Sequence, residues 1–323
     1  MSVIMYGKDT TNKQSNKAES VKDFAKAMRK PSRKKHFGKH LAYQLFYQNP
    51  ESINRKGYQR SIYCSESLIP DQEKGTLYTH RCRCRWCPTC ASIQTAQFIA
   101  GYGRQLDKLD DLWFVTLTRP TVTADELEGQ IKLFQKHWNA ITKDRYWKAN
   151  KPKGLRKMEC TIRPNGMYHY HFHIIIQGKE NAEWIQKKWL YLNPESNGLA
   201  QDIRPIKQGQ YIEVFKYFTK LLVKDEKGKR YIDFKRLDFV FQTIRGRRIY
   251  QPFGGLKKIK EEIDDNRLVS ERVPDEYLRI WDWMTSVGYV DKKTGEVLTG
   301  DWKLPKWVQE LTGTIPGNEE ESE

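Results

Sequence analysis

The middle of the chain carries the most regular pattern of hydrophobic and polar positions. Residues 112–118 (LWFVTLT) alternate in polarity and are rich in β-formers, which predicts a strand. After this strand, large apolar residues recur at steps of three and four, the period of an amphipathic helix. These residues are Leu127, Ile131, Phe134, Trp138 and Ile141.

Residues 156–178 predict a β-hairpin, because Asn165-Gly166 supplies a turn signal between two runs of β-formers. Three further elements complete the pattern: a helix over 182–192 with Asn181 as its N-cap, a strand over 200–206 and a helix over 211–223. The order strand, helix, strand, strand, helix, strand, helix predicts an α+β domain. We expect a ferredoxin-like antiparallel sheet with helices on one face and the other face free to hold a site.

The first 60 residues are strongly basic, with 14 basic and 4 acidic side chains. They are also rich in Lys, Asn, Gln and Ser, a composition typical of disorder. We therefore expect residues 1–60 to form a basic, partly disordered arm. Residues 29–40 (RKPSRKKHFGKH) could track a phosphate backbone, and a tail that only improves solubility is the alternative.

The C-terminal residues 225–323 give a weaker pattern. Residues 230–244 and 274–288 favour short amphipathic helices. A basic, glycine-bearing loop between them (GRRIYQPFGGLKK) includes Arg247 and Arg248, which could contact DNA. The sequence ends in an acidic tail, GNEEESE. We expect a helical, DNA-contacting extension and assign it no fold.

Composition narrows the class of protein. The 323 residues carry a net charge of +17 and a pI near 9.4, which makes a polyanion the expected partner. Hydrophobic residues at 38% and aromatic residues at 12% suffice for a core. No apolar run approaches the ~18 residues of a membrane span, and the N-terminal residues contain no signal-peptide core, so we expect a cytoplasmic protein.

The cysteines are clustered. Four lie within one short segment, at Cys82, Cys84, Cys87 and Cys90, with Cys64 upstream. In a cytosolic protein this spacing indicates metal ligation, and free thiols packed in a core are the alternative. Basic side chains alternate with these cysteines, so the segment is also expected to contact DNA phosphates. They are Arg81, Arg83 and Arg85.

Three histidines alternate along the second strand of the predicted hairpin, at His169, His171 and His173. Side chains of a strand alternate between faces, so all three leave the same side of the sheet. A turn centred near Gly166 places Glu159 opposite His173. A slip of one residue would turn Glu159 to the other face. A carboxylate and two imidazoles suit a divalent cation, with His169 as a further candidate ligand. Ordinary satisfied histidines are the alternative, although three on one face are disfavoured without a ligand.

The predicted helix over 211–223 has a polar face that carries an acid, a phenol and several cations. At about 100° per residue, Glu213, Tyr217 and Lys220 lie together, flanked by Lys216 and opposite an apolar stripe. The helix follows a strand of the sheet that bears the histidines. A tyrosine beside a metal and basic groups suggests nucleophilic attack on a phosphodiester. A solvated face with an ordinary Glu–Lys pair is the alternative.

Four motifs together resemble one known family. They are HYHFHIII (169–176), FVTLTRP (114–120), EVFKYFTK (213–220) and CRCRWCPTC (82–90). In their order along the chain, over about residues 60–255, they resemble the rolling-circle plasmid replication initiators of Gram-positive bacteria, which are HUH endonucleases. Two positions depart from the family pattern: Tyr170 stands where many relatives have proline, and Cys84 is an extra cysteine.

The resemblance implies a metal-dependent enzyme that nicks one strand of a plasmid double-strand origin. Tyr217 would become joined to the 5′ phosphate, and the free 3′-OH would prime synthesis. His171 and His173 would bind Mn²⁺ or Mg²⁺, and Glu213 would be the base of the closing step. Glu159 as a third ligand rests more on the hairpin register. Lys220 or Lys216 could stabilise negative charge. Partners would be origin DNA with the host helicase and polymerase, and the sequence leaves a homodimer open.

The resemblance also bears on the cysteines. A structural zinc takes four ligands, and our preferred set is Cys64, Cys82, Cys87 and Cys90, with Cys84 or His80 able to replace Cys64. We therefore expect four parts: the arm over 1–60, a zinc module over 61–105, the HUH nuclease domain over 106–224 and the extension over 225–323. The rival functions are a related transposase or relaxase, and a non-catalytic zinc-containing DNA-binding regulator.

Overall fold

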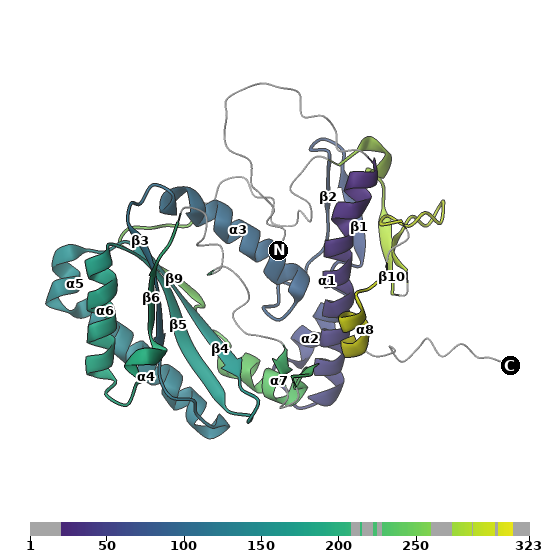
Figure 1. Ribbon diagram of the computed structural model, residues 1–323. Coiled ribbons are helices and arrows are strands. Elements are labelled where there is room, and N and C mark those ends of the chain that lie inside the picture. Colours follow the sequence, from purple (N-terminus) through teal and green to yellow (C-terminus); the bar gives the residue numbers. More distant parts are fainter. Residues whose placement is uncertain are drawn as a thin grey trace.

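The computed structural model describes most of the chain. Its described residues are 21–207, 214, 222–224, 228–259, 273–285, 287–300 and 303–312. They form a mixed α+β structure with two larger antiparallel sheets and one two-stranded sheet. In Figure 1 the five-stranded sheet with its helices lies on one side, and α1 with the four-stranded sheet lies on the other.

The five-stranded sheet has the order β6-β3-β5-β4-β9, with every neighbouring pair antiparallel. Its strands are β3 (Leu112–Thr118), β4 (Gly154–Ile162), β5 (Tyr168–Gln177), β6 (Asp202–Pro205) and β9 (Tyr250–Phe253). The predicted strand over 112–118, the hairpin and the strand near 200–206 are confirmed. Residues 250–253 differ from the predicted loop, because they pair with β4 and extend the sheet.

Two helices cover one face of this sheet. They are α4 (Ala124–Lys143), which α5 (Arg145–Asn150) follows, and α6 (Lys179–Leu192). A capping box formed by Thr123 and Glu126 begins α4, and all five residues of its predicted apolar stripe are buried. They pack against Tyr170, Phe172 and Ile174 of β5, so burial of this stripe holds the helix on the sheet.

The start of α6 differs from the prediction that Asn181 is its N-cap. The N-cap is Gly178, whose φ of +91° is a conformation that favours glycine. A carboxylate oxygen of Asp111 accepts the backbone N–H of Lys179 at 2.8 Å. Asn181 lies inside the helix, and its side chain donates to the Gln177 carbonyl at 2.8 Å. The carboxylate of Asp111, which is distant in the sequence, therefore caps the start of α6.

The other face of the sheet is partly covered, in contrast to the free face expected from the sequence. The helix α3 (Pro88–Leu106) contributes Tyr102 and Leu106 to an apolar cluster with Leu155 of β4 and Ile175 of β5. His173 and His171 come two and four residues before Ile175, respectively, on the same strand face. This cluster therefore closes one end of the face beside the histidines.

The N-terminal segment is folded from residue 21 onward, which corrects the expectation of a partly disordered arm for that part. It forms α1 (Val21–Gln48) and α2 (Arg55–Ile62). Leu41 and Leu45 of α1 are fully buried in the main core, where they join Tyr58 of α2. The average composition of this segment is typical of disorder, but burial of the apolar face of α1 attaches it to the core.

The four-stranded sheet joins distant parts of the chain in the order β11-β10-β1-β2. Its strands are β1 (Ser67–Asp71), β2 (Thr76–Tyr78), β10 (Trp281–Met284) and β11 (Gly288–Val290). The helix predicted over 274–288 is therefore wrong for most of that range. Trp281 and Trp283 are buried and alternate with Asp282, which has the period of a strand.

The remaining described elements are short. They are α7 (Phe234–Thr243), α8 (Lys306–Thr312), β7 (Val223–Lys224), β8 (Arg230–Tyr231) and 3₁₀ turns at Gly198–Ala200 and Asp275–Tyr277. The helix expected over 230–244 is confirmed for the length of α7. Val223, expected at the end of a helix, begins β7. The described part of the chain contains no helix with the length and apolarity needed to cross a membrane.

Candidate functional site

A carboxylate and two imidazoles converge on the sheet face opposite α4 and α6. One ligand atom each of Glu159, His171 and His173 lies within 4.8 Å of the other two. The Nε2 atoms of the two histidines are 3.0 Å apart. The Glu159 carboxylate oxygens lie 3.7 Å from His171 Nε2 and 3.6 Å from His173 Nε2. The structure thus brings together the three residues that the sequence singled out.

The hairpin register differs by two residues from the prediction. Glu159 pairs with His171, and the residue opposite His173 is Lys157. The turn is tight, because the Gly166 N–H donates to the Arg163 carbonyl at 2.9 Å. A shift of two residues preserves the alternation of faces, so Glu159 remains on the histidine side.

Hydrogen bonds behind the histidines orient their rings. His171 Nδ1 lies 3.3 Å from the His169 carbonyl oxygen, and His173 Nδ1 lies 3.2 Å from Thr116 Oγ1. These partners occupy the Nδ1 side of each ring and leave both Nε2 atoms directed at Glu159. Such orientation by a second hydrogen bond is typical of metal-binding histidines.

Electrostatics favour an ionised Glu159 carboxylate beside a neutral His171 imidazole. Burial, assisted by the neighbouring His173, lowers the pKa of His171 to about 4. Burial alone would raise the pKa of Glu159, but Lys157 and the two imidazoles outweigh it and lower that pKa. At neutral pH the group therefore offers one negative charge and nitrogen lone pairs, a donor set that fits a divalent first-row cation.

Lys157 is a site residue that the sequence reasoning missed. Its side chain is 1% exposed, and its ammonium lies 3.0 Å from a Glu159 carboxylate oxygen. Lys157 and Glu159 are two residues apart in β4 and so share a face, which means that the alternation of the strand could have predicted Lys157 on the histidine face. Its charge stabilises the ionised carboxylate next to the imidazoles.

His169 does not join this group. Arg163 Nη2 lies 2.6 Å from His169 Nδ1. The ring of His169 is half-buried, with its centroid 5.1 Å from that of His171. His169 therefore flanks the candidate metal site.

The predicted catalytic residues Tyr217, Glu213 and Lys220, together with Lys216, lie outside the described residues. One neighbour is described: Val214 is 1% exposed and packs with Phe114 and Ile175. That apolar cluster is on the histidine-bearing face of the sheet.

The cysteine cluster gathers as expected. One sulfur atom each of Cys64, Cys82, Cys87 and Cys90 lies within 4.8 Å of the other three. Cys64 follows α2, Cys87 is the N-cap of α3, and Cys90 lies in the first turn of that helix. All the cysteines are free thiols. Four converging sulfur atoms could hold a metal ion, and their number and type fit a structural zinc.

The two alternative ligands are not among the four converging atoms, although Cys84 packs beside them. The Cys84 sulfur is 3.5 Å from the carbonyl oxygens of Gly57 and Cys82. His80 is exposed, and its carbonyl accepts the Ser65 N–H. Neither belongs to the group of four.

The predicted DNA-contacting arginines have different environments. Arg83 is exposed, whereas Arg81 is half-buried. Arg85 is half-buried and donates to the carbonyl of Ile244 at 3.1 Å, so it links the cysteine segment to the end of α7. Arg247 and Arg248 line one cavity beside the five-stranded sheet.

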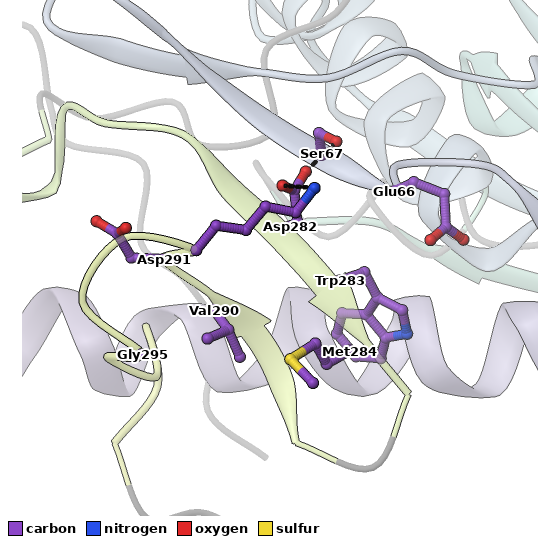
Figure 2. A pocket seen from close by; sticks show the side chains of 9 residues that line it. Glu66, Ser67, Asp282, Trp283, Met284, Val290, Asp291 and Gly295 are labelled. Carbon is purple, nitrogen blue, oxygen red and sulfur yellow. Dashed lines mark hydrogen bonds and ion pairs between the residues drawn. The ribbon is translucent and has the colours of Figure 1, made fainter.

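A larger cavity, of about 490 Å³, opens on the four-stranded sheet. Figure 2 shows its lining. The Lys292 ammonium lies 3.1 Å from an Asp282 carboxylate oxygen. Glu66 pairs with lysines of α1, and Asp291 pairs with Arg279. Because basic partners already neutralise these carboxylates, this cavity has no charge arrangement that indicates chemistry.

Comparisons with known proteins agree with the arrangement of motifs. A family model described as replication protein matches residues 75–278. A protein named "Protein rep" from Staphylococcus aureus is 28% identical over 160 residues, which cover 46% of this chain and 69% of that protein. Another "Protein rep", from Lentilactobacillus hilgardii, is 25% identical over 284 residues, which cover 72% of this chain and 87% of that protein. No solved structure gives a significant match.

Proposed function

Because the chain belongs to the replication protein family, we propose that it initiates rolling-circle replication by nicking one strand of a plasmid double-strand origin. The observation that carries this proposal is the convergence of Glu159, His171 and His173 on one sheet face. The family and the relatives named "Protein rep" support the role in replication.

The nicking site would consist of this group and the segment that follows Val214. Glu159, His171 and His173 would hold Mn²⁺ or Mg²⁺. When bound, the cation supplies Lewis-acid polarisation of the scissile phosphate. Lys157 keeps Glu159 ionised, and Thr116 holds the ring of His173. The packing of Val214 on the same face supports Tyr217, three residues later, as the nucleophile.

In the proposed reaction the Tyr217 oxygen attacks phosphorus and the 3′ oxygen of the neighbouring nucleotide leaves. A tyrosine–5′-phosphate ester forms, and the departing oxygen takes a proton to become a 3′-OH. Lys220 or Lys216 would stabilise the charge that develops on phosphate. A host polymerase could extend the 3′-OH while a host helicase separates the strands.

Glu213 would activate water for the final cleavage, after the origin has been copied. A carboxylate with an ordinary pKa near ~4.3 is ionised at neutral pH and can accept a proton. Glu213→Gln should therefore keep the first cut and the covalent adduct but lose release by hydrolysis. The measurement is the yield of free 5′-phosphate ends, and a wild-type rate of release would refute this role.

The strand order also supports a ferredoxin-like HUH fold. Within the sheet, β6-β3-β5-β4 are the fourth, first, third and second strands of a strand–helix–strand–strand–helix–strand unit. Both helices of that unit pack on one face. We further propose that Cys64, Cys82, Cys87 and Cys90 hold a structural zinc.

The deciding experiment is incubation of labelled single-stranded origin DNA with the protein and Mn²⁺. Wild-type protein should yield a covalent protein–DNA adduct, and Tyr217→Phe should abolish it while DNA binding persists. Tyr191→Phe is the matched control, because Tyr191 is 78% exposed on α6. An undiminished adduct in Tyr217→Phe would show that another residue attacks. Binding without an adduct in the wild type would favour a non-catalytic DNA-binding regulator.

A further inference from the structure

Arg156 is a charged side chain buried on one face of the five-stranded sheet, and Glu159 lies on the other face. It precedes Lys157 in β4, and the two side chains leave opposite faces. Arg156 is 2% exposed. Its guanidinium lies over the rings of Phe172, at 4.1 Å, and Trp138, at 4.8 Å, measured to the ring centroids. The aromatic faces attract the positive charge but do not neutralise it.

The hydrogen bonding of Arg156 is incomplete. Nη2 donates to the side-chain oxygens of Gln251 at 2.6 Å and Gln135 at 3.4 Å. Nε and Nη1 have no partner among the described residues. No described carboxylate forms an ion pair with this guanidinium either. Burial lowers the pKa of Arg156 to about 10, so the group stays charged at neutral pH. A buried cation with unused N–H groups is costly unless an anion accepts them.

A cavity of about 290 Å³ adjoins this guanidinium. Its polar lining consists of groups that can donate hydrogen bonds: Arg156, Arg247, Arg248, Gln135, Gln251 and Tyr170. Among the described residues, no carboxylate lines it. Arg247 is held in place from the other side, where Nε donates to the Thr243 carbonyl at 2.9 Å and Nη2 lies 3.7 Å from Glu128. Arg248 is exposed at the rim.

We propose that this cavity binds a phosphate group. Guanidinium N–H groups match phosphate oxygens in geometry, and three arginines line this cavity, to whose lining no described residue contributes a carboxylate. The phosphate could belong to a DNA backbone or be free in solution, and both present the same oxygens. The cavity is across the sheet from Glu159, so this is not the phosphate that would be cut. The inference therefore stands independently of the proposed nicking reaction.

The first test is thermal unfolding of the full chain in inorganic phosphate, compared with chloride at equal ionic strength. A ligand that binds the folded state raises the midpoint temperature in proportion to its affinity. Phosphate should raise the midpoint of the wild type, and Arg248→Ala should weaken the apparent affinity about tenfold. The control is Arg245→Ala, an exposed arginine of the same loop outside the cavity, which should respond like the wild type.

Arg156→Met should abolish the response to phosphate if the variant folds. Because Arg156 is buried, this variant can fail to fold, and the exposed Arg248 then decides. The proposal is overturned if phosphate stabilises the wild type no more than chloride does. It is also overturned if Arg248→Ala responds to phosphate as strongly as Arg245→Ala.

A second measurement identifies the source of the phosphate. DNA binding is titrated over a range of salt concentrations for Arg248→Ala and Arg245→Ala, which lose the same charge. If the phosphate belongs to DNA, Arg248→Ala alone should reduce the slope of log affinity against log salt by about one. If it is free phosphate, the two slopes agree while the difference in thermal response remains. Neither measurement requires DNA cleavage.

Discussion

At the scale of single residues, side chains alternate between the two faces of β4, and this alternation decides whether each one lies at the histidine site or in the aromatic core. Lys157 and Glu159 share the face of the two histidines, whereas Arg156 lies among the aromatic residues beneath α4. A register shift of one residue would exchange these roles, and the observed difference of two residues does not. The site therefore depends mainly on which residues of β4 share a face, that is, on their separation by an even number of positions.

Glu159→Gln should weaken Mn²⁺ binding, by about tenfold or more, because it removes the one negative charge of the donor set. Titration calorimetry with Mn²⁺ measures the effect. Glu183→Gln is a suitable control, since Glu183 is a partly exposed residue of α6 that pairs only with Lys179 among the described residues. If the double variant His171→Ala/His173→Ala still binds Mn²⁺ like the wild type, the ion is held elsewhere.

At the scale of secondary-structure elements, a buried hydrogen-bond network attaches the N-terminal helices to α7. Asp238 of α7 is 4% exposed and accepts from Tyr58 of α2, from Ser52 at 2.6 Å and from Gln242 at 2.7 Å. These contacts join residues far apart in the sequence. They explain how the basic segment from residue 21 becomes part of the folded molecule.

Tyr58→Phe should lower the free energy of unfolding by about 1–2 kcal/mol, because it removes a donor to a buried carboxylate but keeps the ring. Two donors to Asp238 remain, which limits the loss. Urea denaturation provides the measurement, and Tyr63→Phe is the control because Tyr63 is 65% exposed. An equal effect in the two variants would contradict the role of this network.

The buried histidines of α1 predict a loss of stability in acid. Burial, with a smaller effect of His36, lowers the pKa of His40 from 6.5 to about 4. The unfolded chain therefore binds a proton more readily than the folded chain, and stability falls as the pH decreases from about 6.5 towards 4.

His40→Gln should reduce the loss of stability between pH 7 and pH 5 by on the order of 1 kcal/mol, after allowance for solvent screening. Urea unfolding at the two pH values measures it. An unchanged loss in the variant would mean that other groups carry the acid sensitivity.

At the scale of the whole molecule, the cysteine cluster lies where the N-terminal helices, α3 and the four-stranded sheet meet. Lys35 of α1 donates to the Cys64 carbonyl, and the Tyr289 hydroxyl of β11 donates to the Ser65 carbonyl at 2.8 Å. In Figure 1, α2 and α7 lie between the two larger sheets. A metal in this cluster would stabilise the junction without touching the histidine site.

One zinc per chain should remain after weakly bound ions have been removed, as measured by metal analysis. Cys64→Ser should lose the zinc and lower the unfolding temperature, because a ligand is missing. Cys84→Ser should keep the zinc, since its sulfur faces backbone carbonyls. Absence of zinc in the wild type, with every thiol titratable in the native state, would reject the site.

Features that depend on neighbouring residues could be predicted from the sequence alone. Steps of three and four fixed the buried stripe of α4, and alternation placed Glu159, His171 and His173 on one face. The Asn165-Gly166 signal marked the hairpin, and the clustered cysteines, together with the family resemblance, indicated the group of four sulfur atoms. Local hydrogen bonding and periodicity act over a few residues, so these features can be read along the chain.

Features that depend on pairing between distant residues became known from the fold. Ser67 pairs with Asp282, 215 residues away. This pairing makes β10 a strand, although the sequence around it has the pattern of a helix. The pairing of β9 with β4 brings Gln251 to Arg156 and so completes the cavity. Such contacts form where a buried face or an unpaired strand edge meets a complementary partner. No local pattern in a single sequence specifies that partner.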